Sequence, residues 1–366
     1  GGLVGLCFWA LPAMCVSSIE KSGWDVRFSV LYMPPDDDAP NKLLKDLYLQ
    51  REKRGMTFRE LAKRAGFANP SVPFKLERED ANPTLRSVMK YAAGLGVRLK
   101  VEVESVKRIA FFQYVGGSSK TSVTRDVGYL LSQMGNRVLL VDTDPQASLT
   151  SWLGIDKYDV TREQTLLPVA ANKGVPLPEP MQVHGMDLIP STPAFAEAER
   201  HLMGGIGPVH RIRDALDAVD GKYDYVLIDS PPSLGQITTA SVIAADNVVV
   251  PVLAHAKGAD GLPTVLDMMD DWQRAVPNLS IAMFIPTQVG DTRVHKQYLE
   301  AIREQLVQVA PVSTPLKYRP AIYANATEAK VPVPALKPTP ADALAELEAV
   351  TRELLEALGV SVDAEA

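Results

Sequence analysis

The chain has few of the residues that mark a disulfide scaffold or a metal site. Its 366 residues include two cysteines, Cys7 and Cys15, and five histidines. The sequence contains no Cys-x-x-Cys spacing, no His-x-His pair and no HExxH pattern, which excludes a disulfide-stapled fold, a thiolate zinc site and a histidine metal cage. Hydrophobic residues make up 46% of the chain and charged residues 22%, and this balance excludes a disordered chain and a membrane bundle.

The first apolar run lies at the start of the chain. Residues 3–16 are apolar, but no basic segment precedes them, and the run is shorter than the roughly 20 residues that span a bilayer. It therefore predicts neither export nor a membrane anchor. We expect residues 1–40 to be a poorly ordered or artefactual extension, with Met33 as a candidate natural start. The rest is expected to be cytoplasmic and without membrane contact.

The formal net charge of −6 hides an uneven distribution. Residues 41–100 contain 14 Lys and Arg against 6 Asp and Glu, a net charge of +8, so the remainder of the chain carries −14. A basic segment beside an acidic one indicates two modules with different partners. We therefore divide the chain into the extension 1–40, a basic module 41–100 and a larger module 107–360.

Short amphipathic helices fill the basic module. Thr57 is a candidate N-cap for one helix, which Gly66 ends, and Asn69 with Pro70 starts the next, which runs to Arg78. One further helix precedes this pair and another follows it. Two short helices around a glycine turn, within a small all-α bundle, favour a helix-turn-helix domain that binds DNA.

The segments 57–66, 75–78 and 82–97 also resemble the Cro/C1-type repressor family. The resemblance implies that Ser71, Phe74 and Lys75 on the third helix face the major groove and that four arginines and lysines around it contact phosphates: Arg59, Lys63, Arg64 and Arg78. The other interpretation is a helical dimerisation domain whose charges are solvated. The residues that the resemblance assigns to DNA are Arg59, Lys63, Arg64, Ser71, Phe74, Lys75 and Arg78.

The larger module alternates buried strands with amphipathic helices. Residues 109–112 form an apolar run that leads into the glycine- and serine-rich segment 116–122, and a helix follows until Gly135. Another strand is expected at 137–141. The loop of such a βαβ unit lies at a helix N-terminus, where free N–H groups favour a bound phosphate. We predict an α/β P-loop NTPase with a doubly wound, mostly parallel sheet.

The loop departs from the standard P-loop pattern, which has glycine where this chain has Tyr114 and Ser119. Four later segments supply the context: 141–150, 186–191, 223–235 and 245–252. In order and spacing they resemble the ParA-type partition ATPases, a P-loop family with a deviant Walker A sequence that includes MinD-like proteins. The resemblance extends from residue 107 to residue 355.

The resemblance implies a role for each matching residue. Lys120 would bind the β and γ phosphates of ATP, and Thr121 would ligate Mg²⁺, which Asp229 would hold through water with Asp142 assisting. Asp144 would position or activate the attacking water, so Lys120 and Asp144 are the expected catalytic residues. The residues expected to bind nucleotide are Gly116, Gly117, Ser118, Ser119, Lys120, Thr121, Ser122, Pro286 and Thr287.

Val115 is the departure that bears most on catalysis. Members of the family have a lysine there, which crosses to the phosphates of the partner subunit in an ATP-bound homodimer. An isolated cation aimed at developing phosphate charge is worth on the order of 10³-fold in rate. Its absence leaves ATP binding possible and turnover open, and Ser119 adds a side chain near the phosphates.

The resemblance also implies partners. Dimers of the family bind DNA without regard to sequence, and a ParB-like centromere-binding protein stimulates their ATP hydrolysis. Such a protein would be associated with the nucleoid. The candidate cations for the DNA surface are Arg293, Lys296, Lys317, Arg319 and Lys330.

Three functions remain to be weighed. The leading one is plasmid or chromosome partition, with operator binding and autoregulation through the helix-turn-helix domain. The alternative, motivated by Val115 and Ser119, is a nucleotide-sensing or hydrolysis-deficient transcription regulator. An amidoligase related to the cobyrinic acid diamide synthases is disfavoured, because the sequence offers neither room nor a cysteine nucleophile for a glutaminase domain. Residues 331–340 are expected to form a linker before an amphipathic helix at 341–359.

Overall fold

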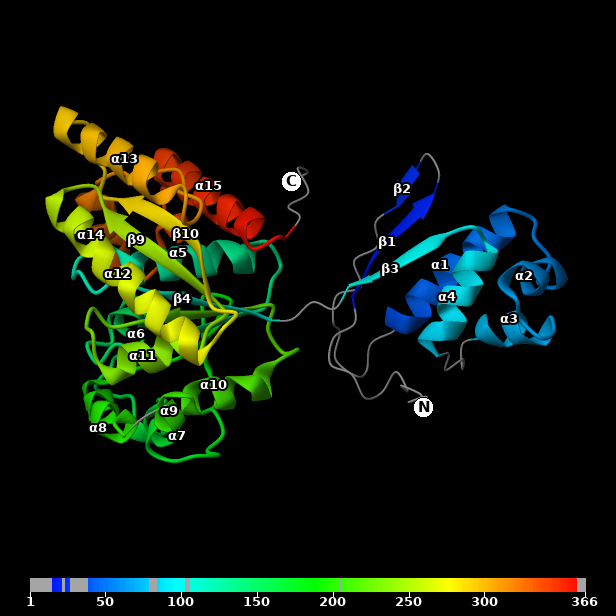
Figure 1. Ribbon diagram of the computed structural model, residues 1–366, viewed down its shortest axis with the longest axis horizontal. Coiled ribbons are helices and arrows are strands. Elements are labelled where there is room, and N and C mark those ends of the chain that lie inside the picture. Colours follow the sequence, from blue (N-terminus) through cyan, green and yellow to red (C-terminus); the bar gives the residue numbers. More distant parts are fainter. Residues whose placement is uncertain are drawn as a thin grey trace. The chain divides into compact units, whose positions relative to one another are not determined.

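The computed structural model describes residues 15–21, 24–26, 39–78, 84–102, 106–204 and 206–360. Two compact units divide the chain, an N-terminal unit of residues 1–105 and a C-terminal unit of residues 106–366 (Figure 1). Among the described residues, no helix is both long and apolar enough to cross a membrane.

The N-terminal unit contains the four helices expected between residues 41 and 100. They pack around a small core in which Leu47, Leu61 and Tyr91 are almost completely buried. The helices are α1 (Ala39–Lys53), α2 (Phe58–Ala65), α3 (Ser71–Leu76) and α4 (Leu85–Gly94).

The predicted helix ends are set by local capping. The Thr57 hydroxyl accepts a hydrogen bond from the Glu60 N–H, the Glu60 carboxylate accepts one from the Thr57 N–H at 2.9 Å, and Gly66 ends α2 in the left-handed conformation. The Asn69 carboxamide accepts a hydrogen bond from the Ser71 N–H at 3.0 Å, but α3 begins at Ser71, one residue later than predicted, and its N-cap Pro70 makes no side-chain hydrogen bond. Helix α3 then ends at Leu76, two residues before the predicted end.

Strands also belong to the N-terminal unit, whereas the sequence predicted helices alone. Strand β3 (Arg98–Glu102) pairs antiparallel with β1 (Cys15–Lys21), which pairs antiparallel with β2 (Trp24–Val26). Two segments of the expected extension 1–40 are thus strands. The sequence analysis missed this pairing because the partners are about 80 residues apart and no local signal joins them. Cys7 and Met33 lie outside the described residues.

Seven strands of the C-terminal unit form one sheet in the order β10-β9-β4-β8-β5-β7-β6 among the residues described. All neighbours are parallel except β6 and β7, so the predicted mostly parallel sheet is confirmed. The strands are β4 (Lys107–Phe111), β5 (Val138–Asp142), β6 (Met181–Val183), β7 (Met186–Ile189), β8 (Tyr225–Asp229), β9 (Asn247–Leu253) and β10 (Ser280–Thr287).

Helices cover both faces of this sheet, as a doubly wound fold requires (Figure 1). One face packs against α5 (Lys120–Gln133), α6 (Ser148–Trp152), α14 (Pro320–Ala329) and α15 (Ala341–Ala357). The other packs against α7 (Leu167–Ala171), α8 (Ala198–Leu202), α9 (Ile206–Val209), α10 (Arg211–Leu216), α11 (Gln236–Ile243), α12 (Ala256–Ala275) and α13 (Arg293–Leu306). The described part of the unit also contains four 3₁₀ turns: Arg162–Gln164, Pro193–Glu197, Asp217–Val219 and Val333–Ala335.

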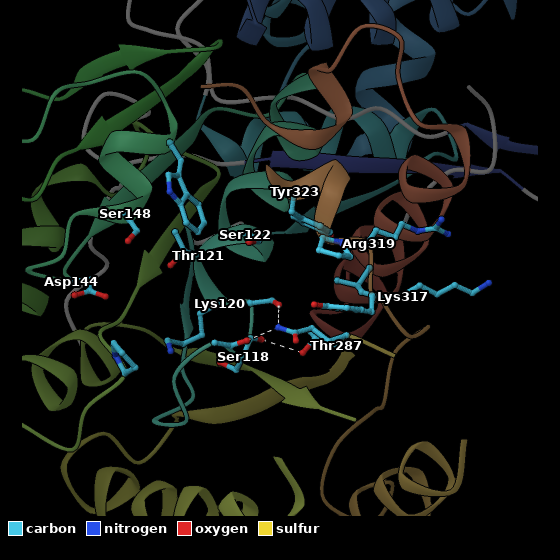
Figure 2. A pocket seen from close by; sticks show the side chains of 18 of the residues that line it. Ser118, Lys120, Thr121, Ser122, Asp144, Ser148, Thr287, Lys317, Arg319 and Tyr323 are labelled. Atoms are coloured by element: carbon cyan, nitrogen blue, oxygen red, sulfur yellow. Dashed lines mark hydrogen bonds between the residues drawn. The ribbon is translucent and has the colours of Figure 1, made fainter. Parts of the chain in front are cut away.

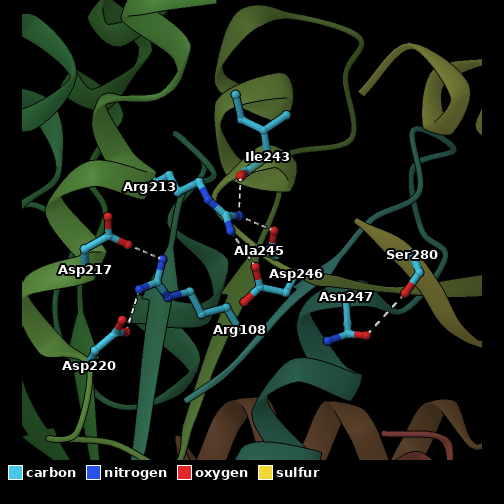
Figure 3. A network of polar contacts seen from close by, with 9 residues as sticks. All are labelled: Arg108, Arg213, Asp217, Asp220, Ile243, Ala245, Asp246, Asn247 and Ser280. Atoms are coloured by element: carbon cyan, nitrogen blue, oxygen red, sulfur yellow. Dashed lines mark hydrogen bonds and ion pairs between the residues drawn. The ribbon is translucent and has the colours of Figure 1, made fainter. Parts of the chain in front are cut away.

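An ion-pair network fixes the amino-terminal ends of β4 and β9 (Figure 3). The guanidinium of Arg108, which is 3% exposed, contacts Asp217 at 2.8 Å and Asp220 at 2.5 Å. Arg213 contacts Asp246 at 2.6 Å and donates to the Ile243 carbonyl at 2.9 Å. This network anchors the end of β4 opposite to the one that leads into the glycine loop.

The expected linker 331–340 is packed against the unit instead of lying free. Val333 is fully buried, and its N–H donates to the Asp126 carboxylate at 2.9 Å. The same carboxylate accepts a hydrogen bond from Arg125 at 2.8 Å, and both side chains of this ion pair are completely buried in α5. The pair therefore ties the segment after α14 to the helix that begins at the glycine loop.

We predict that Asp126→Ala lowers the free energy of unfolding by about 3–5 kcal/mol, because it leaves the Arg125 charge buried without its partner. Urea denaturation of the full chain measures this. Asp271→Ala is the matched control: Asp271 pairs with Arg274 at 2.8 Å on the surface, and its loss should change stability by less than about 0.5 kcal/mol. Equal losses for the two variants would contradict this account.

Candidate functional site

The parallel register brings two carboxylates and the glycine loop to the same edge of the sheet. Phe111, the last residue of β4, is paired with Asp229 at the end of β8, and Asp229 is paired with Asp142 at the end of β5. The loop between β4 and α5 therefore starts beside both aspartates. This is the placement that the sequence predicted for these segments.

The glycine loop has two residues in the left-handed backbone region. Gly117 has φ 79° and Ser119 has φ 69°, immediately before Lys120 begins α5. Lys120 is 6% exposed, and its ammonium donates to the Gln113 carbonyl at 2.7 Å. Burial lowers the pKa of Lys120, while Asp229 and Asp144 raise it. The loop thus surrounds a buried cation that already has carboxylates nearby.

A pocket of about 420 Å³ opens at this edge (Figure 2). Five parts of the chain line it: the glycine loop, the segment from Asp144 to α6, Pro232 after β8, Thr287 and Gln288 at the end of β10, and the segment from Leu316 to Tyr323. The lining residues are Gly117, Ser118, Ser119, Lys120, Thr121, Ser122, Asp144, Gln146, Ser148, Trp152, Pro232, Thr287, Gln288, Leu316, Lys317, Tyr318, Arg319, Pro320 and Tyr323.

Asp229 is a fully buried carboxylate beside this pocket. Neither of its oxygens accepts a hydrogen bond of normal geometry from a described residue. Burial raises the pKa of Asp229 well above its usual value, nearby Asp142 raises it further, and the hydroxyl of Thr121 and the charge of Lys120 lower it. An orphaned buried carboxylate next to a threonine hydroxyl suits Mg²⁺, which prefers oxygen ligands.

Asp142 is held differently from Asp229. One of its oxygens accepts hydrogen bonds from the Thr150 N–H at 2.9 Å and the Thr150 hydroxyl at 2.7 Å, and the other accepts one from the Asp144 N–H at 3.1 Å. Burial raises the pKa of Asp142 to about 7. Asp142 does not line the pocket. Its hydrogen bonds to Asp144 and Thr150 hold the two ends of the loop 144–150 in place without a metal.

Asp144 lies in the pocket wall, where the sequence analysis expected a residue that acts on water. It is 8% exposed, and its carboxylate accepts a hydrogen bond from the Gln146 N–H at 2.9 Å. Burial raises the pKa of Asp144, while the cations Lys120 and Lys157 lower it.

Not every residue predicted for the site reaches the pocket. Pro286 is buried within β10, and its carbonyl accepts a hydrogen bond from the N–H of Leu316, which does line the pocket. Gly116 precedes the lining residues of the loop. Arg319, predicted for DNA, lies in the pocket wall and pairs with Glu346 at 2.7 Å.

The sequence analysis missed several lining residues. Trp152, Gln288, Tyr318 and Tyr323 belong to segments without a motif of their own, and Lys317 was assigned to DNA. The packing of α14 beside α6 brings the late segment to the pocket. The sequence offered one weak signal for this wall. The segment 317–323 is rich in aromatic and basic residues, and it comes after the strand that ends at Thr287 and the helix α13 that follows it.

Val115 takes part in an apolar contact. Its side chain is 6% exposed and lies against α12, where a Cβ added at Gly261 would be 2.8 Å from Val115 Cγ2. Its N–H donates to the Gln113 carboxamide at 3.3 Å. The residue at this position therefore packs inward against α12.

A protein-only metal cage is not found in the described part of the chain. No three His, Cys, Asp or Glu side chains converge there in a way that would hold an ion by themselves. Mg²⁺ commonly takes one or two carboxylates together with substrate phosphates and water, and Asp229 with Thr121 fits that smaller set.

Comparison with known sequences places the C-terminal unit in a family. Residues 106–282 match the family model of an AAA domain. The chain is 40% identical over 258 residues to "Probable plasmid-partitioning protein ParA" of Thermus thermophilus, covering 67% of this chain and 77% of that protein. It is 39% identical over 163 residues to the sporulation initiation inhibitor protein Soj of Bacillus subtilis, covering 44% and 64%.

Solved structures share the fold. The McdA(D38A)–ATP complex of Cyanothece superposes with a TM-score of 0.62 at 24% identity and covers 71% of this chain and 99% of that one. Cobyrinic acid a,c-diamide synthase of Mycobacterium smegmatis, with bound ATP analogue and magnesium, gives a TM-score of 0.53 at 30% identity and covers 61% and 92%.

The sheet order, the loop before α5 and the aspartates beside it define a P-loop NTPase fold. Within that class, the chain belongs to the ParA/Soj family of partition ATPases.

We predict that Asp229→Asn has opposite effects on two quantities: it stabilises the fold and weakens Mg²⁺-dependent binding of an ATP analogue. Removing a buried charge without a hydrogen-bond partner should raise the free energy of unfolding at neutral pH. Affinity for an ATP analogue should fall about tenfold or more when Mg²⁺ is present, the loss expected for one contact to a charged group.

Calorimetry with and without Mg²⁺ measures this affinity. Asp246→Asn, in the network at the other end of the sheet, should leave it unchanged. A variant of Asp229 that binds the Mg²⁺ complex as the wild type does would remove Asp229 from the metal site.

Proposed function

We propose that this chain is an ATP-binding partition protein of the ParA type. The observation that carries the proposal is that Lys120 and Asp144 line one pocket and the buried Asp229 lies beside them, all three following or ending parallel strands that meet at one edge of the sheet. Its ParA relative is named for plasmid partition, and the cobyrinic acid a,c-diamide synthase neighbour holds an ATP analogue and magnesium.

The loop residues have a place in this proposal. Backbone N–H groups of residues 116–122 cradle the phosphates at the start of α5, and Lys120 exchanges its contact with the Gln113 carbonyl for the β and γ phosphates. Thr121 and Asp229 would hold Mg²⁺, which would stabilise negative charge on the phosphate oxygens. Asp144 orients the attacking water.

The remaining wall suits the nucleoside. Thr287 lies beside the loop, with its hydroxyl 3.2 Å from the Ser118 carbonyl. Lys317 and Tyr323 line the pocket from the late segment, and they offer a cation and an aromatic ring to a ribose and a flat base.

Turnover depends on an assembly of two copies in this proposal. ATP binding promotes a homodimer, and a ParB-like partner raises a low basal hydrolysis rate. The burial of Val115 against α12 supports a weak basal rate, because no cation stands at that position of the loop.

We predict that Val115→Lys raises ATP turnover, by up to about 10³-fold, because the added ammonium neutralises charge in the transition state. Turnover is measured with Mg²⁺, DNA and the cognate partner, and dimerisation by light scattering. Val115→Met, which loses the β-branch without adding charge, is the control and should leave turnover unchanged. If the lysine changes neither turnover nor dimerisation, the missing charge does not limit this protein.

For the N-terminal unit we propose operator binding by a Cro/C1-type helix-turn-helix, which would allow the protein to repress its own operon. An ion pair between Arg51 of α1 and Glu77 at the end of α3, at 2.6 Å, fixes α3 in place. Phe74 of α3 is 53% exposed, with its ring centre 5.5 Å from that of Phe58.

Exposed side chains of this unit suit a DNA surface. Ser71, Phe74 and Lys75 are exposed on α3, and Arg59 is exposed on α2. Arg59 would contact phosphates, whereas Lys75 and Phe74 would face the major groove, where a lysine can donate to a guanine and an aromatic ring can contact a thymine methyl group. Arg78 is also exposed, but it already has an interaction within the chain.

A second, sequence-independent DNA surface is proposed at the start of α13, where Arg293 and Lys296 are exposed. Contacts of this kind would also associate the protein with the nucleoid. Arg319 is a weaker candidate, because its charge is paired with Glu346 in the pocket wall.

We predict that Arg59→Ala weakens binding to the promoter duplex of the chain's own operon and to a random duplex alike, because it removes a phosphate contact, and that the salt slope falls by about 1. Phe74→Ala should weaken binding to the promoter duplex by about 1–3 kcal/mol and leave binding to the random duplex unchanged. Fluorescence anisotropy at several salt concentrations measures both effects.

Met89→Ala is the control, because Met89 is 46% exposed on α4 and is thus a similar apolar surface residue. It should bind both duplexes as the wild type does. The operator proposal fails if the wild-type chain shows no salt-dependent binding to either duplex.

The alternative function is a nucleotide-sensing or hydrolysis-deficient transcription regulator, favoured by the apolar Val115 and by Ser119 in the loop. The two functions differ in turnover. A chain that hydrolyses no ATP with DNA and partner present, and whose operator binding is unaffected by ATP, would favour the regulator over the partition ATPase.

A further inference from the structure

Ser119 has a backbone conformation that an L-residue adopts at a cost. Its φ of 69° and ψ of 18° lie in the left-handed region, one residue before the start of α5. For a residue other than glycine this region costs about 1–2 kcal/mol, and the standard P-loop pattern has glycine there. Such strain at a binding loop persists only where the surroundings hold the residue.

Gln288 makes the contacts that hold Ser119 and its neighbours in this conformation. The Gln288 carboxamide nitrogen donates to the Gly117 carbonyl at 2.6 Å and lies 3.3 Å from the Ser119 hydroxyl oxygen. The neighbouring Thr287 hydroxyl donates to the Ser118 carbonyl at 3.2 Å. Three consecutive loop residues are thus bonded to two consecutive residues at the end of β10, close to the pocket in Figure 2.

Gln288 is itself left-handed, with φ 53°, directly after β10. Two strained residues from distant parts of the chain therefore meet through one carboxamide. The hydrogen bonds of the Gln288 carboxamide join these two backbone segments. The contact also gives the Ser119 hydroxyl a donor from the residue that follows β10.

These contacts bear on phosphate binding. An anion is bound by loop N–H groups, and a peptide plane that flips presents its carbonyl to the anion instead. Carbonyl groups of Gly117 and Ser118 that are bonded to β10 resist such a flip. A loop held in one arrangement loses less conformational freedom when ATP binds.

We propose that Gln288 is a positioning residue for nucleotide binding, which holds the loop in its phosphate-binding arrangement and offsets the strain of a serine at position 119. The inference rests on the proposed ATP binding. Neither the loop pattern nor the family resemblance pointed to Gln288.

The test is a double-mutant cycle on the full chain, with Gln288→Ala, Ser119→Gly and both together. Calorimetry measures the dissociation constant of a non-hydrolysable ATP analogue with Mg²⁺. Gln288→Ala should weaken binding about tenfold, the effect of one or two neutral hydrogen bonds. In the Ser119→Gly background the same change should cost less, because glycine adopts φ 69° without strain.

Two further variants sharpen the result. Gln288→Glu keeps the shape but replaces the donor by an acceptor that faces the Gly117 carbonyl, so it should weaken binding more than alanine does. Gln273→Ala is the matched control: its carboxamide also donates to a backbone carbonyl, that of Leu279 at 2.9 Å, but at the far end of α12. It should bind the analogue as the wild type does.

The outcomes are distinguishable. If Gln288→Ala and Gln288→Glu both bind as tightly as the wild type, or if the loss is equal in the serine and glycine backgrounds, the positioning role is wrong while ATP binding stands. A melting temperature lowered equally by Gln288→Ala and Gln273→Ala, with analogue affinity kept, would also overturn it. If the wild-type chain does not bind the analogue, the proposed ATP site itself is wrong.

Discussion

The parallel register of three strands is the constraint on which the candidate site depends. Because β4, β8 and β5 run side by side in the same direction, Phe111, Asp229 and Asp142 end at the same edge of the sheet. The loop before α5 leaves β4 at that edge, so it starts beside the two carboxylates. The site is therefore a consequence of strand order and direction, while the side chains at the strand ends decide its chemistry.

This arrangement buries charges before any ligand is present. Lys120 and Asp229 are both almost completely buried, yet Lys120 donates to a backbone carbonyl and Asp229 has no hydrogen bond of normal geometry with a described residue. Burial of an ionised group disfavours the charged form, and the attraction between Lys120 and Asp229 offsets only part of that cost. A ligand that brings both a cation and phosphates compensates each charge with an opposite one. The other end of β4, held by Arg108 and its two aspartates, keeps the strand in place.

The sequence predicted the parts of this fold that have local signals. Strand, glycine loop and helix were predicted at residues 109–135, since an apolar run, glycines and an amphipathic period occur in order. The pairing of β3 with β1 had no such signal, because it joins segments about 80 residues apart. For the same reason the pocket wall from Leu316 to Tyr323 was missed and Arg319 was assigned to DNA. Asp142 was found by its place at a strand end, but its hydrogen bonds with Thr150 depend on how a later loop folds back.

The two departures from the family pattern have different physical consequences. At position 115 an apolar side chain packs against Gly261, so the inward contact is satisfied and only a charge is missing. At position 119 a side chain is added in a strained conformation, but its hydroxyl meets the carboxamide of Gln288. The first change removes a positive charge that would stabilise the transition state of hydrolysis. The backbone strain of the second is offset by hydrogen bonds within the chain, which form without nucleotide. Because charge neutralisation in the transition state and loop shape in the ground state are separate contributions, a chain with both changes can keep nucleotide affinity while its hydrolysis rate falls.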